Sequence, residues 1–361
     1  MECILTGREM AELDKYTIEH IGIPSLVLME NASRAMADVI YKNHKDKRIL
    51  VIAGTGNNGA DGLCICRILR TRGVDCRYRI IGNPEKATEQ FQTQKEILDR
   101  LGYSQESAEQ FWDNSWAEVV VDALFGVGLS RNITGKYAQA IEEINNMKAY
   151  KYAVDIPSGI SATDGRVFGE AFQADATVTF QDRKLGLFLF PGALYTGKVC
   201  VTDIGIDSFT VKEQLDTAYA LEMSDIAKLL PERPPYAHKG TFGKLLLIAG
   251  SSGGAAFLSA CAAYRMGAGL VRIYTTEDNR SILQQLIPEA IITTYTEYDE
   301  ASLLSVLEWA DAVCIGSGLG RSDVADLIVN TVLKEINVPC LIDADGINIL
   351  ATHPEWKDRL A

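Results

Sequence analysis

The chain has 361 residues, of which 47% are hydrophobic and 23% are charged, and its formal net charge is −13. This composition is typical of globular α/β proteins and excludes a disordered or fibrous chain, while the length suggests two domains of roughly 150 residues or more. Because the acidic balance repels phosphodiester backbones and the sequence contains no basic patch, we expect no nucleic-acid partner.

The N-terminal residues and the cysteines bear on the compartment. Charges between Arg8 and Lys15 interrupt the position where a signal peptide needs an apolar stretch. The most apolar long segment, 253–271, is broken by Arg265, so we expect no membrane span. The eight cysteines are scattered singly, which fits a reducing cytoplasm. The pair Cys64-x-Cys66 has no second Cys or His cluster, which argues against zinc.

The first part of the chain predicts a doubly wound parallel sheet of the Rossmann-like class. A capping-box pattern, Thr6-x-x-Glu9, introduces helices expected at 6–20 and 24–42. Apolar runs and helix-length segments then alternate. The expected elements are strand 48–53, helix 59–72, strand 76–81, helix 86–101, strand 118–125, helix 135–147, and strands 151–156, 175–181 and 197–205.

A second α/β alternation begins at Lys244, after a polar stretch that runs from Asp207 to a proline cluster at 234–235. The expected strands are 244–249, 269–275, 311–315 and 338–343, and the expected helices are 254–267, 279–286 and 323–335. The glycine loops that open the two halves are similar, but their spacing to the next strands differs, so they are not an internal repeat. We predict domains at 1–215 and 216–361.

The glycine loop of the first half, GTGNNG at 54–59, matches the dinucleotide-binding pattern G-x-G-x-x-G between a strand and a helix. A nicotinamide-dependent oxidoreductase is therefore one hypothesis. However, the acid that such a site requires at the end of the second strand is absent from the segment 80–83. The loop also carries Asn57, Asn58 and Asp61, whose side-chain oxygens suit a hard cation or a sugar. A glycine turn capped by asparagine would explain the glycines but not Asp61.

Polar residues follow two further strands. Asp122 and Asp155 end apolar strands, and Ser158 comes shortly after the second. Each aspartate alone could be a turn or helix cap, but the carboxyl ends of parallel strands meet at one crevice, where these residues can converge with those of the glycine loop. The segment 126–132, GVGLSRN, adds freely accessible amides and one cation, which can receive a phosphate.

These motifs resemble known families. The segments NNGADGL (57–63), DALFGVGLSRN (122–132), VDIPSGI (154–160), LMENA (28–32) and KVCVTDIGI (198–206) resemble NAD(P)H-hydrate epimerases. The second half resembles ADP/ATP-dependent NAD(P)H-hydrate dehydratases, which have a ribokinase-like fold, at 238–275, 316–320 and 343–350. The two halves in this order resemble the bifunctional NAD(P)H-hydrate repair enzymes.

The resemblance implies hydrated NADH or NADPH as substrate, and we expect a homo-oligomer. It implies K⁺ held by Asn58, Asp122 and Ser158. Substrate contacts are implied for Asn57, Asn58, Gly59, Ala60, Asp61, Gly126, Val127, Gly128, Leu129, Ser130, Arg131 and Asn132. Asp155 matches the acidic residue beside the substrate, and we expect it to be the catalytic acid/base that protonates the leaving hydroxyl and deprotonates the returning water. Lys136 is a weaker candidate for a phosphate contact.

In the second half, the resemblance implies ADP or ATP as a cofactor and contacts to the hydrated cofactor from Gly254, Ala255, Ala256 and Gly318. The family continues after the DAD segment at 343–345 to two further motifs, one of which carries the catalytic Asp, and neither is found here. His353 lies in a partial mimic of the first of them, and we expect it at the surface.

We therefore expect an active epimerase joined to an incomplete dehydratase whose parallel sheet is uncovered on one face. A non-catalytic scaffold is the alternative outside the enzymes. Asp155 and the intact loop 57–61 argue against that alternative.

Overall fold

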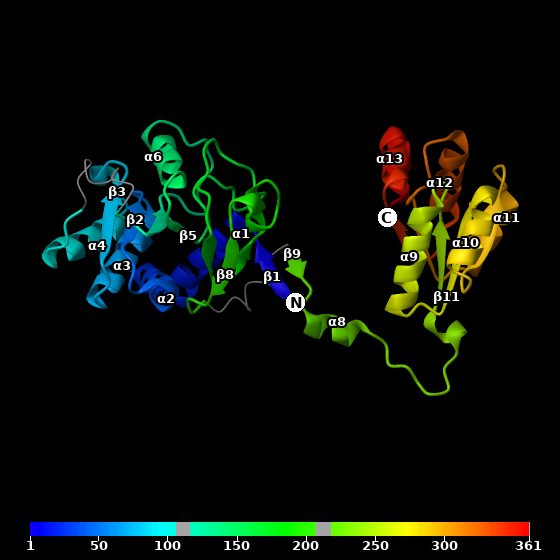
Figure 1. Cartoon of the computed structure of the whole chain (residues 1–361), viewed down its shortest axis with the longest axis horizontal. Coiled ribbons are helices and arrows are strands. Elements are labelled where there is room, and N and C mark those ends of the chain that lie inside the picture. Colours follow the sequence, from blue (N-terminus) through cyan, green and yellow to red (C-terminus); the bar gives the residue numbers. More distant parts are fainter. Residues whose placement is uncertain (106–115, 207–217, 361) are drawn as a thin grey trace. The chain divides into compact units, whose positions relative to one another are not determined.

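The computed structural model describes residues 1–105, 116–206 and 218–360 (Figure 1). The chain forms two compact units, Met1–Leu230 and Pro231–Ala361. The boundary between these units, after Leu230, lies later in the chain than the predicted boundary between the domains 1–215 and 216–361. The predicted domain boundary stays a prediction. Among the described residues, no helix combines the length and the apolar composition that a membrane span requires.

The first unit is built on a parallel sheet, as predicted. Within its described residues the sheet has six strands in the order β3-β2-β4-β5-β6-β8. The strands are β2 (Ile49–Ala53), β3 (Cys76–Ile80), β4 (Val119–Ala123), β5 (Tyr150–Val154), β6 (Ala176–Phe180) and β8 (Lys198–Thr202). Every neighbouring pair is parallel. Residues of β2, β4 and β6 are buried throughout because helices or loops cover both faces of the sheet.

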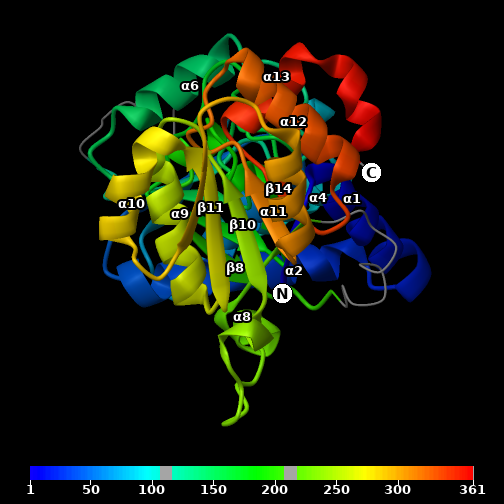
Figure 2. The ribbon, with the colours of Figure 1, turned by 90° about the vertical axis from the view of Figure 1, so that its right-hand side faces the viewer.

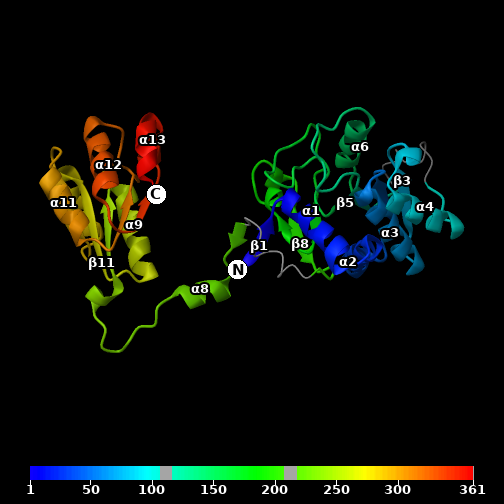
Figure 3. The ribbon, with the colours of Figure 1, turned by 180° about the vertical axis from the view of Figure 1, so that it is seen from behind.

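Helices cover the two faces of this sheet. They are α1 (Gly7–Tyr16), α2 (Ser25–His44), α3 (Asn57–Thr71), α4 (Glu89–Arg100) and α6 (Lys136–Asn145), with a π-helical turn at Thr17–Ile21 after α1. The predicted capping box is present, since Thr6 and Glu9 exchange side-chain and backbone hydrogen bonds. Leu63 of α3 packs in one core with Val51, whereas Ile141 of α6 packs in another with Ile52. Neighbouring residues of β2 thus point to opposite faces, and α6 lies on the side away from α2 and α3 (Figures 1 and 3).

A small second sheet and a helix were not predicted. Among the described residues, β1 (Glu2–Leu5) pairs in parallel with β7 (Arg183–Lys184) and antiparallel with β9 (Ala218–Ala220), and α8 (Met223–Leu229) follows. Strands of two to four residues are too short to show an alternation of apolar and polar residues. The segment interpreted as a polar connection therefore contributes β9 to the first unit.

The second unit also has a parallel sheet, with five strands in its described residues in the order β12-β11-β10-β13-β14. The strands are β10 (Lys244–Ile248), β11 (Leu270–Thr276), β12 (Ile291–Tyr295), β13 (Ala312–Ile315) and β14 (Cys340–Ile342). The helices are α9 (Gly253–Met266), α10 (Arg280–Leu286), α11 (Glu300–Trp309), α12 (Asp323–Glu335) and α13 (Asp345–Thr352). Across the described residues of both units, short turns of 3₁₀ helix occur at 84–86, 185–187, 192–194, 239–242, 277–279 and 354–359.

The expectation that one face of this sheet would be uncovered is wrong. Helices α9 and α10 pack on the face that carries Leu247 and Ile273, and α11, α12 and α13 pack on the face that carries Leu246 and Ile315 (Figure 2). The reason is that α11, which was not predicted, adds cover to the face that carries Leu246, and β12, which was also not predicted, extends the sheet beside β11. Apolar surface does remain at β14, where Leu341 is 62% exposed.

Candidate active site

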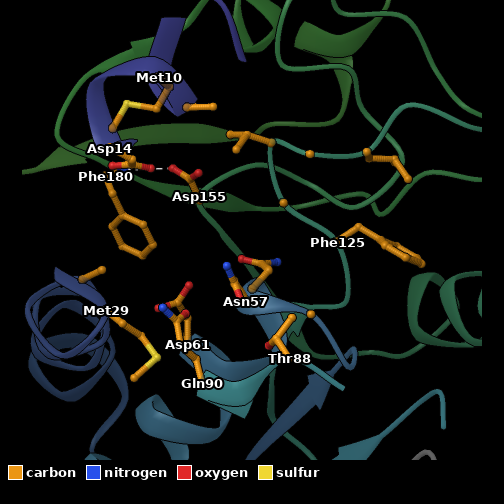
Figure 4. Close-up of a pocket in the computed structure, with 18 of the residues that line it drawn as sticks. Met10, Asp14, Met29, Asn57, Asp61, Thr88, Gln90, Phe125, Asp155 and Phe180 are labelled. Carbon is orange, nitrogen blue, oxygen red and sulfur yellow. Dashed lines mark hydrogen bonds between the residues drawn. The ribbon is translucent and has the colours of Figure 1, made fainter. Parts of the chain in front are cut away.

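A cavity of about 960 Å³ opens at the carboxyl ends of β2, β4 and β5, which is where a parallel sheet binds ligands. Its walls come from α1, the start of α2, the glycine loop, the segment 124–131 and the end of β6 (Figure 4). This volume lies at the upper end of the range of ligand pockets and is sufficient for a nucleotide-sized molecule.

The glycine loop is shaped by close backbone contacts. Gly54 N donates to Ala123 O at 2.9 Å, which ties the loop to β4. A Cβ at Gly59 would lie 2.0 Å from Gly54 O, so no side chain fits there. Helix α3 then begins at Asn57, two residues before the predicted start, with Gly56 as a cap that offers no side-chain hydrogen bond. Its first amides are therefore available to an anionic ligand.

The structure brings most of the predicted substrate-contacting residues to this cavity. Asn57, Asn58 and Asp61 line it, and so does the segment from Gly126 to Arg131. Positions 59 and 60 are buried beneath the loop. These two positions and position 132 are absent from the described residues that line the cavity. Lys136 does not line it either, and its Nζ lies 5.7 Å from the ring centroid of Tyr137.

Asp122 and Ser158 form a buried cluster behind this wall. Asp122 is fully buried and accepts hydrogen bonds from Ser158 N at 2.8 Å, Ser158 Oγ at 2.7 Å and Leu124 N at 3.1 Å. Phe125 N donates to Ser158 Oγ at 2.9 Å. Burial raises the pKa of Asp122 to about 6 although these hydrogen bonds oppose the shift. The cluster joins the turn after β4 to the loop after β5.

The Asn58 side chain lies against the same turn. A Cβ at Gly126 would lie 3.4 Å from the Asn58 Cγ, which puts the amide against the turn. Among the described residues, the buried Asn58 Nδ2 has no hydrogen-bond partner. Ser158 Oγ also lies 3.3 Å from Phe125 O. One carboxylate among neutral oxygens is a donor set that fits a hard monovalent cation, and rotating the Asn58 amide would turn its oxygen toward such an ion.

Asp155 occupies a strained position at the end of β5. Its φ is +66°, a left-handed conformation that non-glycine residues seldom adopt. Its Oδ1 accepts hydrogen bonds from Thr179 Oγ1 at 3.1 Å, Phe180 N at 3.0 Å and Lys184 Nζ at 2.5 Å. The conformation aims the carboxyl group at the cavity, where it is 13% exposed.

Lys184 was not identified from the sequence. Its side chain is 1% exposed, and its Nζ donates to Phe180 O at 2.8 Å and Thr179 Oγ1 at 3.0 Å in addition to Asp155. A buried ammonium group requires such compensation because its removal from water is costly. The sequence gives no signal for its burial. Lys184 directly follows the charged pair at 182–183, and such a run of charges ordinarily indicates an exposed turn.

Two further aspartates lie in the cavity wall with Asp155, among the described residues. Burial, followed by the charge of Asp155, raises the pKa of Asp14 to about 6, and Lys184 opposes this shift. The same two causes raise the pKa of Asp61 well above its ordinary value, against a hydrogen bond from Ser33. Asp14, on α1, was also missed by the sequence analysis.

Figure 4 shows how these carboxyl groups are arranged. Asp14 and Asp155 lie on one side of the cavity, and Asp61 lies on the opposite side with Asn57. The ring of Phe180 lies between the two sides and gives this part of the cavity an apolar wall. The arrangement combines carboxyl groups with an apolar surface next to the glycine loop.

In the second unit, the predicted residues lie around two neighbouring glycine loops. Gly250 N donates to Gly318 O at 3.0 Å, which joins the loop before α9 to the loop after β13. Ala255 is partly exposed in the first turn of α9, Gly254 is exposed and Ala256 is buried. His353 is 30% exposed, and its ring stacks on Trp356 with the centroids 3.9 Å apart.

Comparisons with known proteins match a different family to each half of the chain. Residues 25–186 match the family described as YjeF-related protein N-terminus, and residues 245–361 match the family described as NAD(P)H-hydrate dehydratase. The chain is 36% identical to the bifunctional NAD(P)H-hydrate repair enzyme Nnr of Moorella thermoacetica, over 97% of this chain and 70% of that protein. It is 43% identical to the NAD(P)H-hydrate epimerase of Limosilactobacillus reuteri, over 55% of this chain and 94% of that protein.

Among solved structures, part of the chain is similar to the ADP/ATP-dependent NAD(P)H-hydrate dehydratase from Bacillus subtilis co-crystallized with ATP/Mg²⁺. The identity is 30%, the TM-score is 0.29, and the match covers 34% of this chain and 44% of that chain.

Proposed function

This chain belongs to the family of bifunctional NAD(P)H-hydrate repair enzymes, and from that premise we propose that its first unit epimerises R and S hydrates of NADH and NADPH, with Asp155 as the catalytic acid/base. The observation that carries the proposal is the position of the Asp155 carboxyl group. It faces the cavity from the end of β5 and is fixed on its other side by Lys184.

The chemistry of the substrate requires such a group. A hydrated nicotinamide carries a hydroxyl on the ring carbon next to the nitrogen, and loss of this hydroxyl leaves an iminium ion that water can attack from either face. Proton donation to the leaving hydroxyl and proton removal from the incoming water both speed the reaction. The negative charge of Asp155 also favours the cationic iminium.

The remaining lining supports binding of a dinucleotide. The amides at the start of α3 and along the segment 126–131 can receive the pyrophosphate, with Arg131 as a cation at its edge. This arrangement places the phosphate-binding groups beside the carboxyl groups, so one bound molecule could contact both.

We also propose that Asn58, Asp122 and Ser158 hold a potassium ion. The proposal is supported by the unpartnered buried amide of Asn58 and by the full burial of the Asp122 carboxyl group. A bound cation would supply a positive charge for Asp122. These residues connect the turn at 125–126 with the loop that begins at Asp155, so the ion would stabilise both walls of the cavity.

The test is to incubate the protein with separated R and S forms of hydrated NADPH and to follow their interconversion by chromatography. We expect the purified forms to reach the same R/S ratio, far faster than without protein. No acceleration over the spontaneous reaction would reject the proposal. An oxidoreductase would instead consume NADPH with an added carbonyl compound, and a scaffold protein would do neither.

We propose that the second unit is of the ADP/ATP-dependent dehydratase type and contacts the hydrated cofactor through Ala255, Ala256 and Gly318. The test is whether this polypeptide alone regenerates NADPH from its S hydrate. The measurement is the rise in absorbance of the reduced nicotinamide after ADP or ATP is added. An enzymatic rate would show that residues present here perform the dehydration.

The proposed compartment is the cytoplasm, which is supported by the eight cysteines, because they are scattered singly along the sequence. We propose in addition that the protein is a homo-oligomer. Support comes from the loop before β8, in which Phe190 is 74% exposed and Leu194 is 61% exposed. Light scattering coupled to size-exclusion chromatography measures the mass, and a monomer at micromolar concentration would reject this proposal.

A further inference from the structure

Epimerisation makes a demand that a single fixed carboxyl group meets only if the nicotinamide ring turns over. The hydroxyl leaves the ring carbon from one face, and the water that gives the opposite configuration arrives at the other face. A carboxyl group must lie within hydrogen-bond reach of the oxygen whose proton it moves. Either an acid/base group therefore lies on each side of the ring, or the ring must turn over between the two steps.

The cavity has carboxyl groups on two opposing walls. Asp155 stands at the end of β5, and Asp61 stands in the second turn of α3, across the cavity from it (Figure 4). We propose that Asp61 and Asp155 serve opposite faces of the nicotinamide ring, so that one gives a proton to the leaving hydroxyl while the other takes a proton from the incoming water. The inference rests on the proposed epimerase function.

The surroundings of the two groups suit different protonation states. Asp155 Oδ1 accepts from a buried ammonium group, a backbone amide and a hydroxyl, and this is the environment of a carboxylate. For the Asp61 carboxyl group, the single hydrogen bond found among the described residues comes from Ser33 Oγ at 3.4 Å. Burial and the charge of Asp155 raise the pKa of Asp61, which favours its protonated form.

The proton transfers balance when Asp61 and Asp155 together carry one proton. In one direction the Asp61 acid protonates the hydroxyl, the C–O bond breaks, and water leaves with the bonding electrons. The lone pair of the ring nitrogen forms the C=N bond of the iminium ion. Water on the other face then forms a new C–O bond as the C=N electrons return to nitrogen, and the Asp155 carboxylate takes the released proton. The reverse direction uses the same groups with exchanged roles.

Asp14 does not meet the same requirement. Figure 4 places it beside Asp155, on the same side of the cavity, and its pKa is raised in part by that neighbour. A second group on one wall cannot serve the other face of the ring. The opposing position of Asp61 is what singles it out.

Exchange of the substrate hydroxyl with H₂¹⁸O shows on which face of the nicotinamide ring water adds. The experiment uses the full chain with purified R or S hydrated NADPH, and mass spectrometry after chromatography gives the ¹⁸O content of each epimer. We expect wild type to label both epimers while interconverting them. Asp61→Asn should lose at least ~100-fold in epimerisation but still label one epimer with retention, and Asp155→Asn should label only the other epimer.

Other outcomes would overturn the inference. Epimerisation by Asp61→Asn within about threefold of wild type would remove Asp61 from the chemistry. Loss of labelling in both epimers, or a raised KM with unchanged kcat, would indicate a role in binding or folding instead. Asp99→Asn, on the surface of α4, is the matched control, and thermal unfolding checks that each variant is folded. A wild type that does not epimerise would reject the proposed function itself, not the pairing alone.

Discussion

Lys184 Nζ lies 2.5 Å from Asp155 Oδ1, and the lysine side chain is almost completely buried. The lysine lies in β7, shortly after β6 ends, whereas the aspartate follows β5, so the contact joins the segments that leave two neighbouring strands. Because each charge compensates the other away from bulk water, neither can be removed alone without leaving an unpaired buried charge. The same contact leaves the rest of the Asp155 carboxyl group directed at the cavity.

Lys184→Met should therefore destabilise the first unit by about 3–5 kcal/mol, since it leaves the Asp155 carboxylate buried without its counter-charge. The double variant Lys184→Met/Asp155→Asn should recover most of this loss while remaining inactive as an epimerase. Denaturant unfolding of the wild type, both single variants and the double variant measures the coupling. Lys198→Met, at an exposed position of β8, is the control. Additive effects of the two substitutions would show that the pair contributes no coupling energy.

Asp122→Ala should weaken the proposed potassium site, so that the variant requires more potassium than the wild type. If Asn58, Asp122 and Ser158 bind the ion, potassium should raise the Tm of wild type with a saturating dependence, and this increase should shift to higher potassium concentrations in the variant. Epimerase activity of the variant should depend on added potassium. Measurements in a bulky organic cation at equal ionic strength provide the reference. Equal stability and activity of the wild type in both salts would contradict the site.

The sequence predicted the parts of the fold that depend on local patterns. The strands of the large sheet were predicted because apolar runs alternate with helix-length segments. Asp155 was predicted as a site residue because it ends such a run. Lys184 and Asp14 were missed for a shared reason. The burial of Lys184 and the packing of α1 over the strand ends depend on tertiary contacts, which charge patterns do not encode.

The missed elements of the second unit are different, because their signals were present. The segment 291–295 is rich in β-branched residues, and Asp299 is an N-cap whose side chain accepts from Ser302 N. Recognising them would have predicted the cover of the second sheet correctly.

Gly59→Ala should disrupt the glycine loop. The new Cβ would lie 2.0 Å from Gly54 O, a contact that forces the start of α3 away from the residue that follows β2. We expect a loss of several kcal/mol in the free energy of unfolding, in the range of strained core substitutions. Gly56→Ala is the matched control for stability, because a Cβ there meets no atom within 4 Å and its φ of −97° suits any residue. Equal unfolding midpoints of the two variants would contradict the tight packing of the loop.

Asp14→Asn should stabilise the protein relative to wild type, and this difference in stability should increase as the pH rises. An aspartate in an unfolded chain has a pKa of about 3.9, whereas burial and the charge of Asp155 raise the pKa of Asp14 in the fold to about 6. The folded wild type thus binds more protons than the unfolded chain between these values, and this group's contribution to stability decreases as the pH rises through that window. Above it, the buried carboxylate costs up to ~3 kcal/mol, at about 1.4 kcal/mol for each pKa unit.

The asparagine variant does not titrate and is free of this cost. The difference in Tm between variant and wild type should therefore be small near pH 4, increase up to about pH 7 and then level off. Asp46→Asn, in the exposed turn after α2, removes the same charge at the surface and controls for net charge. A difference in Tm between the Asp14 variant and wild type that stays constant from pH 4 to pH 8 would mean that the carboxyl group of Asp14 titrates alike in the folded and unfolded chain, which its packing beside Asp155 argues against.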